Sequence, residues 1–300
     1  MAVSDALSQP EPQTGNWRDY LELTKPRVVA VMVLTSIVGM LLASPQLPSL
    51  TLFIMANLGI ALAAGAAATV NHVVDRRIDA FMNRTKRRPV ADGKVKPWLA
   101  LSFAACLASL GLLILVVYAN PLTAVLTFAS VIGYALIYTL YLKRATPQNI
   151  VIGGIAGASP PLLGWVAVTG SVDPNALLLV AIIFAWTPPH FWALCLAKQA
   201  EYAEAGIPML PVTHGRQYTK LHMVLYTLLM VVVTLLPVLT GMCGWIYVLW
   251  VSVLNCRFLW LMRTVWYSED DADAMRLFFY SIRYIMWLFL ALLVDHFVIL

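Results

Sequence analysis

Long runs of apolar residues, separated by short polar breaks, dominate the chain. Nine stretches are mostly apolar and are close to the length, about 20 residues, that an α-helix needs to cross a hydrocarbon layer roughly 30 Å thick. They cover residues 28–45, 51–74, 98–119, 122–142, 150–170, 176–197, 221–240, 242–262 and 277–300. The pattern predicts an all-α integral membrane protein with nine transmembrane helices.

Composition places these stretches in lipid rather than in a soluble core. Of the 300 residues, 61% are hydrophobic and 12% are charged, whereas about 25% of the residues in soluble domains are charged. The mean hydropathy is +0.79. These values exclude an ordinary soluble domain, a disordered chain and a coiled coil.

The basic residues are confined to one side of the predicted bundle. With nine spans, all 20 Lys and Arg residues fall in the N-terminal segment or around the loops that follow even-numbered spans. The opposite side carries only Asp173 and Asp295. The positive-inside rule therefore predicts a cytoplasmic N-terminus and a periplasmic C-terminus. The net charge of +5 is a topology signal, and we expect no nucleic-acid partner.

The first 27 residues are polar and carry both signs of charge. They contain no apolar region before a small-residue cleavage site, so they do not have the pattern of a secretory signal. We expect residues 1–27 to form a polar cytoplasmic tail that is solvated. Residues 28–300 are expected to form a single nine-helix intramembrane domain.

Three oxygen-bearing side chains lie at the end of the second predicted span. Asn71, Asp75 and Asp79 are spaced i, i+4 and i+8, which puts them along one edge of a helix over roughly 12 Å. Such ligands suit Mg²⁺, which is usually bound by one or two carboxylates together with substrate phosphates. The alternative is a solvated helix end whose carboxylates pair with neighbouring arginines.

Basic residues lie on the same predicted side of the membrane as this carboxylate stripe. Arg84, Arg87 and Arg88 lie in the loop that follows it, and Lys143 and Arg144 follow the fourth span. Their side chains are good partners for phosphate oxygens. Taken alone they are typical cytoplasmic anchors. The loop arginines directly after the stripe favour a diphosphate-binding site, and Lys143 and Arg144 could close over a phosphate.

His190 lies in the sixth predicted span, within the sequence Trp186-Thr187-Pro188-Pro189-His190-Phe191-Trp192. We expect the two prolines to interrupt the helical hydrogen bonds at this point. A histidine at a broken intramembrane helix is a candidate proton carrier or iron ligand. A purely structural histidine is the alternative.

These residues resemble the UbiA-type intramembrane prenyltransferases over nearly the whole chain, from Leu23 to the ninth span. The carboxylate stripe, followed by Met82-Asn83-Arg84-Thr85 and by Arg88-Pro89, is similar to the motif of that superfamily. Two longer blocks, residues 141–158 and 186–194, are similar to its haem-prenylating branch, and residues 206–212 extend the second block.

The resemblance implies a nine-helix fold that transfers farnesyl from farnesyl diphosphate to a vinyl group of haem B, with addition of water, giving haem O and diphosphate. It also implies binding of Mg²⁺ and diphosphate by Asn71, Asp75 and Asp79 and phosphate contacts by the five basic residues. His190 would position haem or move a proton. The implied location is the bacterial inner membrane, with the active-site loops on the cytoplasmic side. The implied recipients of the product are haem-copper oxidase assembly or a haem A synthase.

The loop after the sixth span departs from the family pattern. Many members carry a second aspartate-rich motif there, whereas this chain has Lys198 and Glu201, with Glu204 beyond. We therefore expect fewer carboxylates for a second metal ion and a direct contact between Lys198 and phosphate.

Other functions stay open at this point. One is a UbiA-type prenyltransferase that acts on an aromatic or quinone precursor. Another is a polytopic transporter that uses intramembrane His and Asp residues, although the charges here lie at helix ends rather than at mid-bilayer depth. A third is a non-catalytic haem-handling factor, which would leave the carboxylate stripe without a role.

Overall fold

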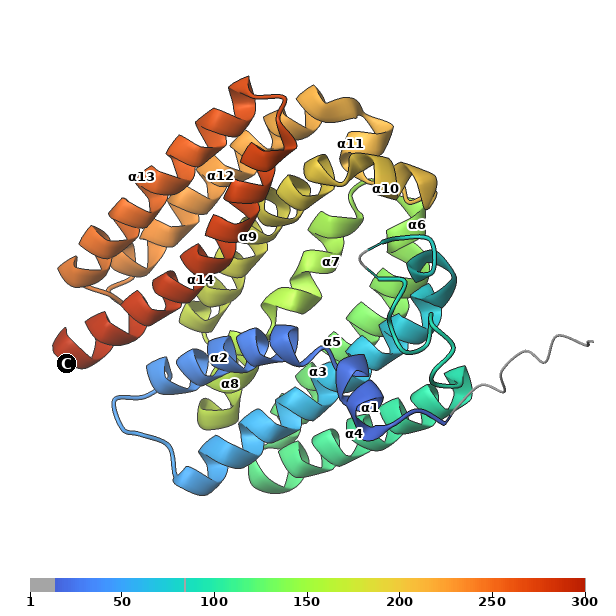
Figure 1. Cartoon of the computed structure of the whole chain (residues 1–300). Coiled ribbons are helices and arrows are strands. Elements are labelled where there is room, and N and C mark those ends of the chain that lie inside the picture. Colours follow the sequence, from blue (N-terminus) through green and yellow to red (C-terminus); the bar gives the residue numbers. More distant parts are fainter. Residues whose placement is uncertain (1–13, 84, 300) are drawn as a thin grey trace, which may run out of the picture.

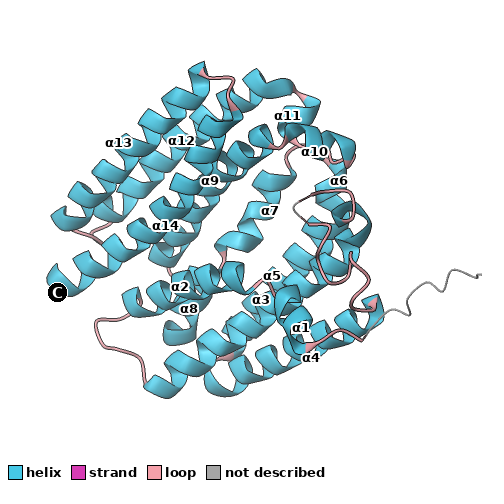
Figure 2. Cartoon of the chain, viewed as in Figure 1, coloured by secondary structure: helices cyan, strands magenta, loops and turns pink. Residues whose placement is uncertain are grey.

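Helices make up the regular structure of this protein, as the hydrophobic pattern predicts. The computed structural model describes residues 14–83 and 85–299, apart from the side chains of residues 144 and 299. No strand occurs among these residues (Figures 1 and 2). Arg84 and the side chain of Arg144, both expected near phosphate, therefore lie outside the described residues.

The long helices coincide with the predicted spans. Seven elements are single helices: α2 (Pro26–Leu42), α3 (Leu50–Asp79), α4 (Pro97–Tyr118), α9 (Pro174–Ala197), α12 (Gly215–Leu239), α13 (Trp245–Tyr267) and α14 (Asp271–Ile299). Two spans are composite: α5 (Pro121–Ile132) continues into the π-helix η1 (Gly133–Leu142), and α7 (Asn149–Ala158) is followed by α8 (Pro160–Thr169). In the described part of the chain, eight spans are long and apolar enough to cross a membrane. The ninth is α2 taken with α1 (Trp17–Leu23), at a 52° bend.

Helix α1 lies in the segment that was expected to be a solvated tail. Asn16 caps it by accepting hydrogen bonds from the backbone N–H groups of Arg18 and Asp19 at 2.9 and 3.1 Å. The Asp19 carboxylate accepts one from the Asn16 backbone in return, at 2.8 Å, which completes a capping box. Leu23 is fully buried, in an apolar cluster with Val73 of α3. This part of the expected tail is thus helical and is docked onto α3 by an apolar contact, while most of its residues stay exposed.

Helix α9 passes through Pro188 and Pro189 as one continuous helix, so the missing proline N–H donors do not break the helix there as expected. Both prolines are buried, and α7, α12 and α14 all pack against α9. Proline is tolerated within a membrane helix where surrounding protein compensates for the lost hydrogen bonds. In the fifth span, Ser159 separates α7 from α8.

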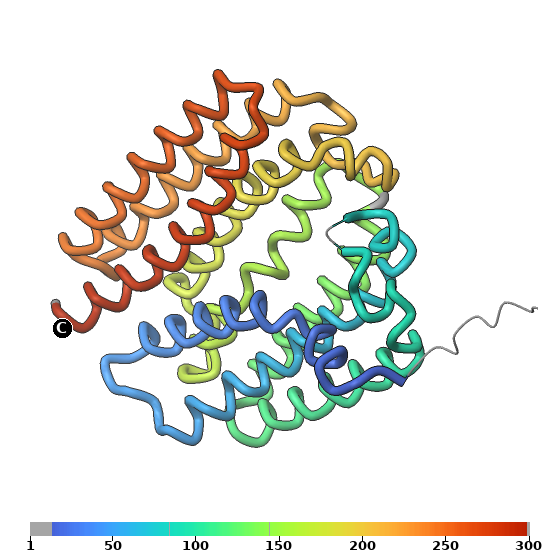
Figure 3. The backbone as a smooth tube through the Cα atoms, viewed as in Figure 1, coloured from blue at the N-terminus to red at the C-terminus, as the bar shows by residue number. Residues whose placement is uncertain are grey.

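Six elements contact one another in a closed cycle, whose chain path can be followed in Figure 3. The contacts run from α2 to α3, η1, α7, α9 and α14, and α14 returns to α2. Helix α4 packs against α3, α12 packs against α9, and α13 packs against α14. Loop residues 80–83 and 85–96 lie on the right-hand side of Figure 1, as do three short helices: α6 (Lys143–Ala145), α10 (Gln199–Glu204) and α11 (Leu210–Thr213).

Candidate active site

The carboxylate stripe lies on the buried side of α3, near its C-terminal end. Asn71, Asp75 and Asp79 are 4%, 1% and 3% exposed, so the edge predicted from their spacing faces into the protein. Asn71 Nδ2 donates to Asp75 Oδ2 at 2.8 Å and to Thr139 Oγ1 of η1 at 3.3 Å. Two carboxylates can be buried in this way only if neighbouring cations and donors compensate for their lost hydration.

Each member of the stripe accepts a hydrogen bond from a basic side chain of a different segment. The pairs are Lys25 Nζ to Asn71 Oδ1 at 2.5 Å, Lys143 Nζ to Asp75 Oδ2 at 2.6 Å, and Arg88 Nη1 to Asp79 Oδ2 at 2.7 Å. Lys25 precedes α2, Lys143 begins α6, and Arg88 lies in the loop after α3. Three segments that are distant in sequence therefore meet at one helix edge, and two of the six residues predicted to contact phosphate, Lys143 and Arg88, lie there.

This set of ligands suits a hard divalent cation. The Asp75 Oδ1 atom is buried and has no hydrogen-bond partner among the described side chains, so it is available to coordinate a metal ion. Two carboxylates and an amide oxygen are the ligand types that Mg²⁺ prefers. The ammonium and guanidinium groups beside them are suited to binding phosphate oxygens.

The π-helix η1 lies between the stripe on α3 and the glycine pair of α7. Thr139 Oγ1 donates to the backbone carbonyl five residues earlier at 2.7 Å, a spacing that belongs to π-helical geometry. The Tyr138 ring packs directly on Gly153 of α7, where a Cβ would overlap it. On the same helix a Cβ at Gly154 would lie 3.2 Å from the Thr187 methyl group of α9. The glycine pair thus lets α7 approach η1 and α9 closely.

His190 of α9 lies between two aromatic rings. Its ring centroid is 4.3 Å from that of Trp186, at an interplanar angle of 15°, and 4.7 Å from that of Phe278 of α14, at 19°. His190 Nδ1 is 2.6 Å from Ser281 Oγ, and Trp186 Nε1 donates to the Ser281 carbonyl at 2.9 Å. Helix α14 therefore holds the imidazole ring in place.

Among the described residues, Lys198 contacts Glu201 of α10 rather than the stripe. Its Nζ atom pairs with Glu201 Oε1 at 3.1 Å, and its side chain is 41% exposed. With Arg216 and Asp271 it lines a cleft of about 500 Å³. Its contact with phosphate remains a prediction, as does that of Arg87, which is exposed in the loop after α3.

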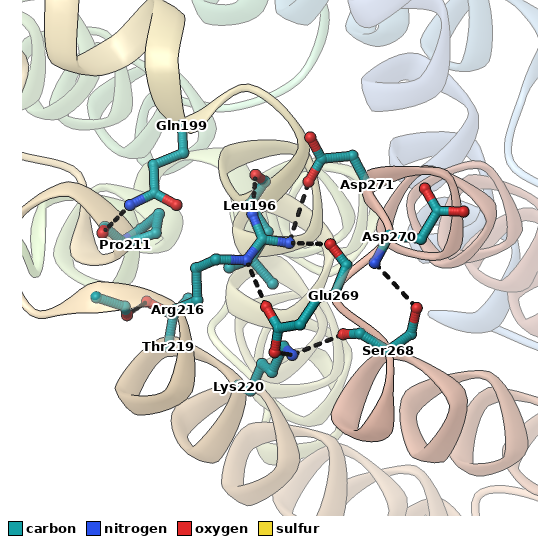
Figure 4. Close-up of polar contacts among 11 residues, drawn as sticks. Leu196, Gln199, Pro211, Arg216, Thr219, Lys220, Ser268, Glu269, Asp270 and Asp271 are labelled. Atoms are coloured by element: carbon teal, nitrogen blue, oxygen red, sulfur yellow. Dashed lines mark hydrogen bonds and ion pairs between the residues drawn. The ribbon is translucent and has the colours of Figure 1, made fainter.

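A second group of charges joins the start of α12 to the loop between α13 and α14 (Figure 4). Lys220 is fully buried and donates to the Ser268 carbonyl and to Glu269 Oε1, both at 2.7 Å. Arg216 donates to Glu269 Oε2 at 3.1 Å and to the Leu196 carbonyl of α9 at 3.0 Å. The hydrogen bond and positive charge of Lys220 lower the pKa of the Glu269 carboxyl. These contacts hold the start of α12 against the end of α9 and against the loop between α13 and α14.

Three residues of the site were not identified from the sequence as site residues. Lys25 enters the sequence-based predictions only as a topology charge. Its φ of 51° makes it the one non-glycine residue in the left-handed region within the described part of the chain, and no sequence pattern indicates this. Thr139 and Ser281 are ordinary helical hydroxyls whose partners lie 68 and 91 residues away.

The fold is shared with solved structures of UbiA homologues. A structure of a digeranylgeranylglyceryl phosphate synthase superposes with a TM-score of 0.78 at 19% identity and covers 93% of this chain and 98% of that one. A UbiA homologue from Archaeoglobus fulgidus, bound to DMAPP and Mg²⁺, superposes with a TM-score of 0.65 at 15% identity over 91% and 99% of the two chains.

Sequence similarity then defines the family. Residues 32–290 match the UbiA prenyltransferase family, and this chain belongs to it. The protoheme IX farnesyltransferase of Marinobacter nauticus is 62% identical over 285 residues, which cover 95% of this chain and 94% of the relative. The Hahella chejuensis protein of the same name is 60% identical and covers 95% of both chains.

Proposed function

We propose that this protein transfers the farnesyl group of farnesyl diphosphate to a vinyl group of haem B, with addition of water, giving haem O and diphosphate. The observation that carries this proposal is the 62% identity to a protoheme IX farnesyltransferase along nearly the full length of both chains. The buried carboxylate stripe with its three cations supports the diphosphate half of the reaction.

For the diphosphate, Asn71, Asp75 and Asp79 would hold Mg²⁺, which when bound neutralises charge on the leaving group. Lys143 and Arg88 already lie on carboxylate oxygens, from which they would turn to phosphate oxygens. We extend the same proposal to Lys25 and to the remaining predicted contacts, which are Arg84, Arg87, Arg144 and Lys198.

For the acceptor, the loss of diphosphate leaves a farnesyl cation, which the haem vinyl group attacks. Water then adds to the resulting cation next to the porphyrin and releases a proton. The Trp186, His190 and Phe278 rings would offer an aromatic surface near the haem, and His190 would position haem or take up the proton. Water must otherwise be kept from the farnesyl cation, for which an apolar membrane site is suited.

The proposal places this chemistry in the inner membrane of a bacterium, on its cytoplasmic face. The end of α3 that carries the stripe contacts Arg88 of the following loop and Lys143 of α6, and these elements lie side by side (Figure 1). The positive-inside rule assigns that end to the cytoplasm. Haem O would pass from there to a haem A synthase or to haem-copper oxidase assembly.

The test is to incubate the purified full chain in nanodiscs with haem B, farnesyl diphosphate and Mg²⁺, and to identify products by mass spectrometry. We expect haem O with Mg²⁺ and none with a chelator. Asp79→Asn should lower the rate roughly 100-fold or more, as for loss of other groups that stabilise developing charge. Asp92→Asn is the matched control, because Asp92 is a half-exposed loop carboxylate paired only with Lys94 in the described structure.

Two results would contradict parts of this proposal. Full activity of Asp79→Asn, or activity that a chelator leaves unchanged, would remove the metal-binding role of the stripe. Failure to prenylate haem, together with prenylation of an aromatic acceptor offered in a parallel incubation, would show that the acceptor is a different one.

A further inference from the structure

We propose that Ser281 is a positioning residue that fixes His190 in one tautomer, with the proton on Nδ1 and a lone pair on Nε2 for coordination to the iron of the haem substrate. This inference rests on the proposed function, since it takes haem as the acceptor. Ser281 lies in α14, in a part of the sequence that contains no recognisable motif.

The direction of the hydrogen bonds determines the tautomer. Ser281 Oγ donates its single proton to the Phe278 carbonyl at 2.6 Å. The same oxygen lies 2.6 Å from His190 Nδ1, so in that contact it must be the acceptor and Nδ1 must be the donor. In a neutral imidazole the other nitrogen is then unprotonated. His190 Nε2 therefore carries a lone pair.

The ring cannot readily turn away from this arrangement. Trp186 and Phe278 cover its two faces at centroid distances of 4.3 and 4.7 Å. Trp186 is itself attached to the Ser281 carbonyl through its indole N–H. No described residue forms a hydrogen bond with Nε2, and His190 remains partly exposed. The free nitrogen is thus held at a constant position and angle.

The surroundings favour coordination over proton transfer. The chain of hydrogen bonds ends at a backbone carbonyl, which has no proton to exchange, so a proton cannot be relayed through Ser281. No described carboxylate contacts His190, whereas the histidine of a Ser-His-Asp triad is oriented by a carboxylate that stabilises its protonated form. Histidine ligands of metals instead donate their second N–H to a neighbouring acceptor that fixes the ring. A neutral imidazole is also a common axial ligand of haem iron.

The first test titrates ferric haem B into the full chain in nanodiscs without farnesyl diphosphate, followed by absorption and electron paramagnetic resonance spectra. The wild type should show a histidine-ligated spectrum that His190→Gln loses. Ser281→Ala should weaken haem binding about 10- to 100-fold and change the spectrum, whereas Ser281→Thr, which keeps the hydroxyl, should restore both. Ser130→Ala is the matched control, because Ser130 Oγ also donates to a helix carbonyl, that of Leu126 at 2.9 Å, but contacts no histidine.

A second measurement needs no variant at Ser281. The ¹⁵N chemical shifts of the histidines, assigned by comparison with His190→Gln, report which ring nitrogen carries the proton. We expect a protonated Nδ1 and an unprotonated Nε2 in the wild type. A proton on Nε2 would overturn the inference, and so would a folded Ser281→Ala protein with the wild-type haem affinity and spectrum.

These outcomes are separable from those of the proposed function. A wild-type protein that shows the histidine-ligated spectrum but makes no haem O would contradict the proposed reaction and leave the role of Ser281 standing. A protein that makes haem O without any histidine-ligated spectrum would contradict the role of Ser281 alone.

Discussion

Replacing Lys143 by methionine would leave the Asp75 carboxylate buried without its charged partner. Lys143 Nζ and Asp75 Oδ2 are 2.6 Å apart, with side chains that are 14% and 1% exposed. At an effective dielectric constant of about 20, this distance corresponds to an attraction of about 6 kcal/mol. Dehydration of both groups offsets part of it, and removal of one partner of a buried pair typically costs about 3–5 kcal/mol.

We therefore expect Lys143→Met to lower the free energy of unfolding by about 3 kcal/mol or more. Asp75→Asn should cost less, because the lysine that it leaves can turn its ammonium group towards water. The double variant has no unpaired charge at this pair, so it should be about 2–3 kcal/mol more stable than the two single effects predict when added.

The assay is unfolding of the four proteins in mixed micelles with increasing dodecyl sulfate, followed by circular dichroism. The exposed pair of Lys94 and Asp92, with N and O 2.8 Å apart and side chains 49% and 42% exposed, is the matched control cycle. Its coupling should stay below about 1 kcal/mol. A coupling below about 0.5 kcal/mol for Lys143 and Asp75 would refute the view that this pair is buried and mutually compensating.

Three other predictions concern different parts of the molecule. Gly164→Ala should destabilise the fold by about 1–3 kcal/mol, because its Cβ would overlap a backbone carbonyl of α2. The control is Gly157→Ala, since a Cβ at Gly157 would have nothing within 4 Å. Equal unfolding curves for the two variants would disprove the close contact at Gly164. Lys220 lowers the pKa of Glu269 in the folded protein below its ordinary 4.5. The contact between them should therefore stabilise the fold fully above about pH 4.5, and this stabilisation should be lost as the pH falls through the pKa of Glu269 in the folded protein. Glu269→Gln should remove that part of the pH dependence, and an unchanged profile in this variant would count against the contact. Lys25→Gln should raise the KM for farnesyl diphosphate about 10-fold or more, the value of one charge-assisted hydrogen bond, without changing haem affinity; a wild-type KM would exclude Lys25 from the diphosphate site.

Local patterns were sufficient to predict the spans and the stripe. A backbone in lipid must satisfy its own hydrogen bonds, so an apolar run of the right length forms a helix whatever its neighbours are. The spacing of Asn71, Asp75 and Asp79 depends only on the helical period, and their common burial agrees with it. The continuous course of α9 through Pro188 and Pro189 could not be predicted in this way, since it depends on the helices packed around it.

Contacts between distant segments are a different matter, because hydropathy and periodicity describe one helix at a time. Nothing in the local pattern says that Lys25 reaches Asn71 across 46 positions, or that Ser281 reaches His190 across 91. Both contacts exist because packing closes α2, α3, η1, α7, α9 and α14 into one cycle. Residue types and helix faces can therefore be recognised from the sequence. The residue that pairs with each charged group, or that fixes the tautomer of His190, depends on how the helices pack against one another.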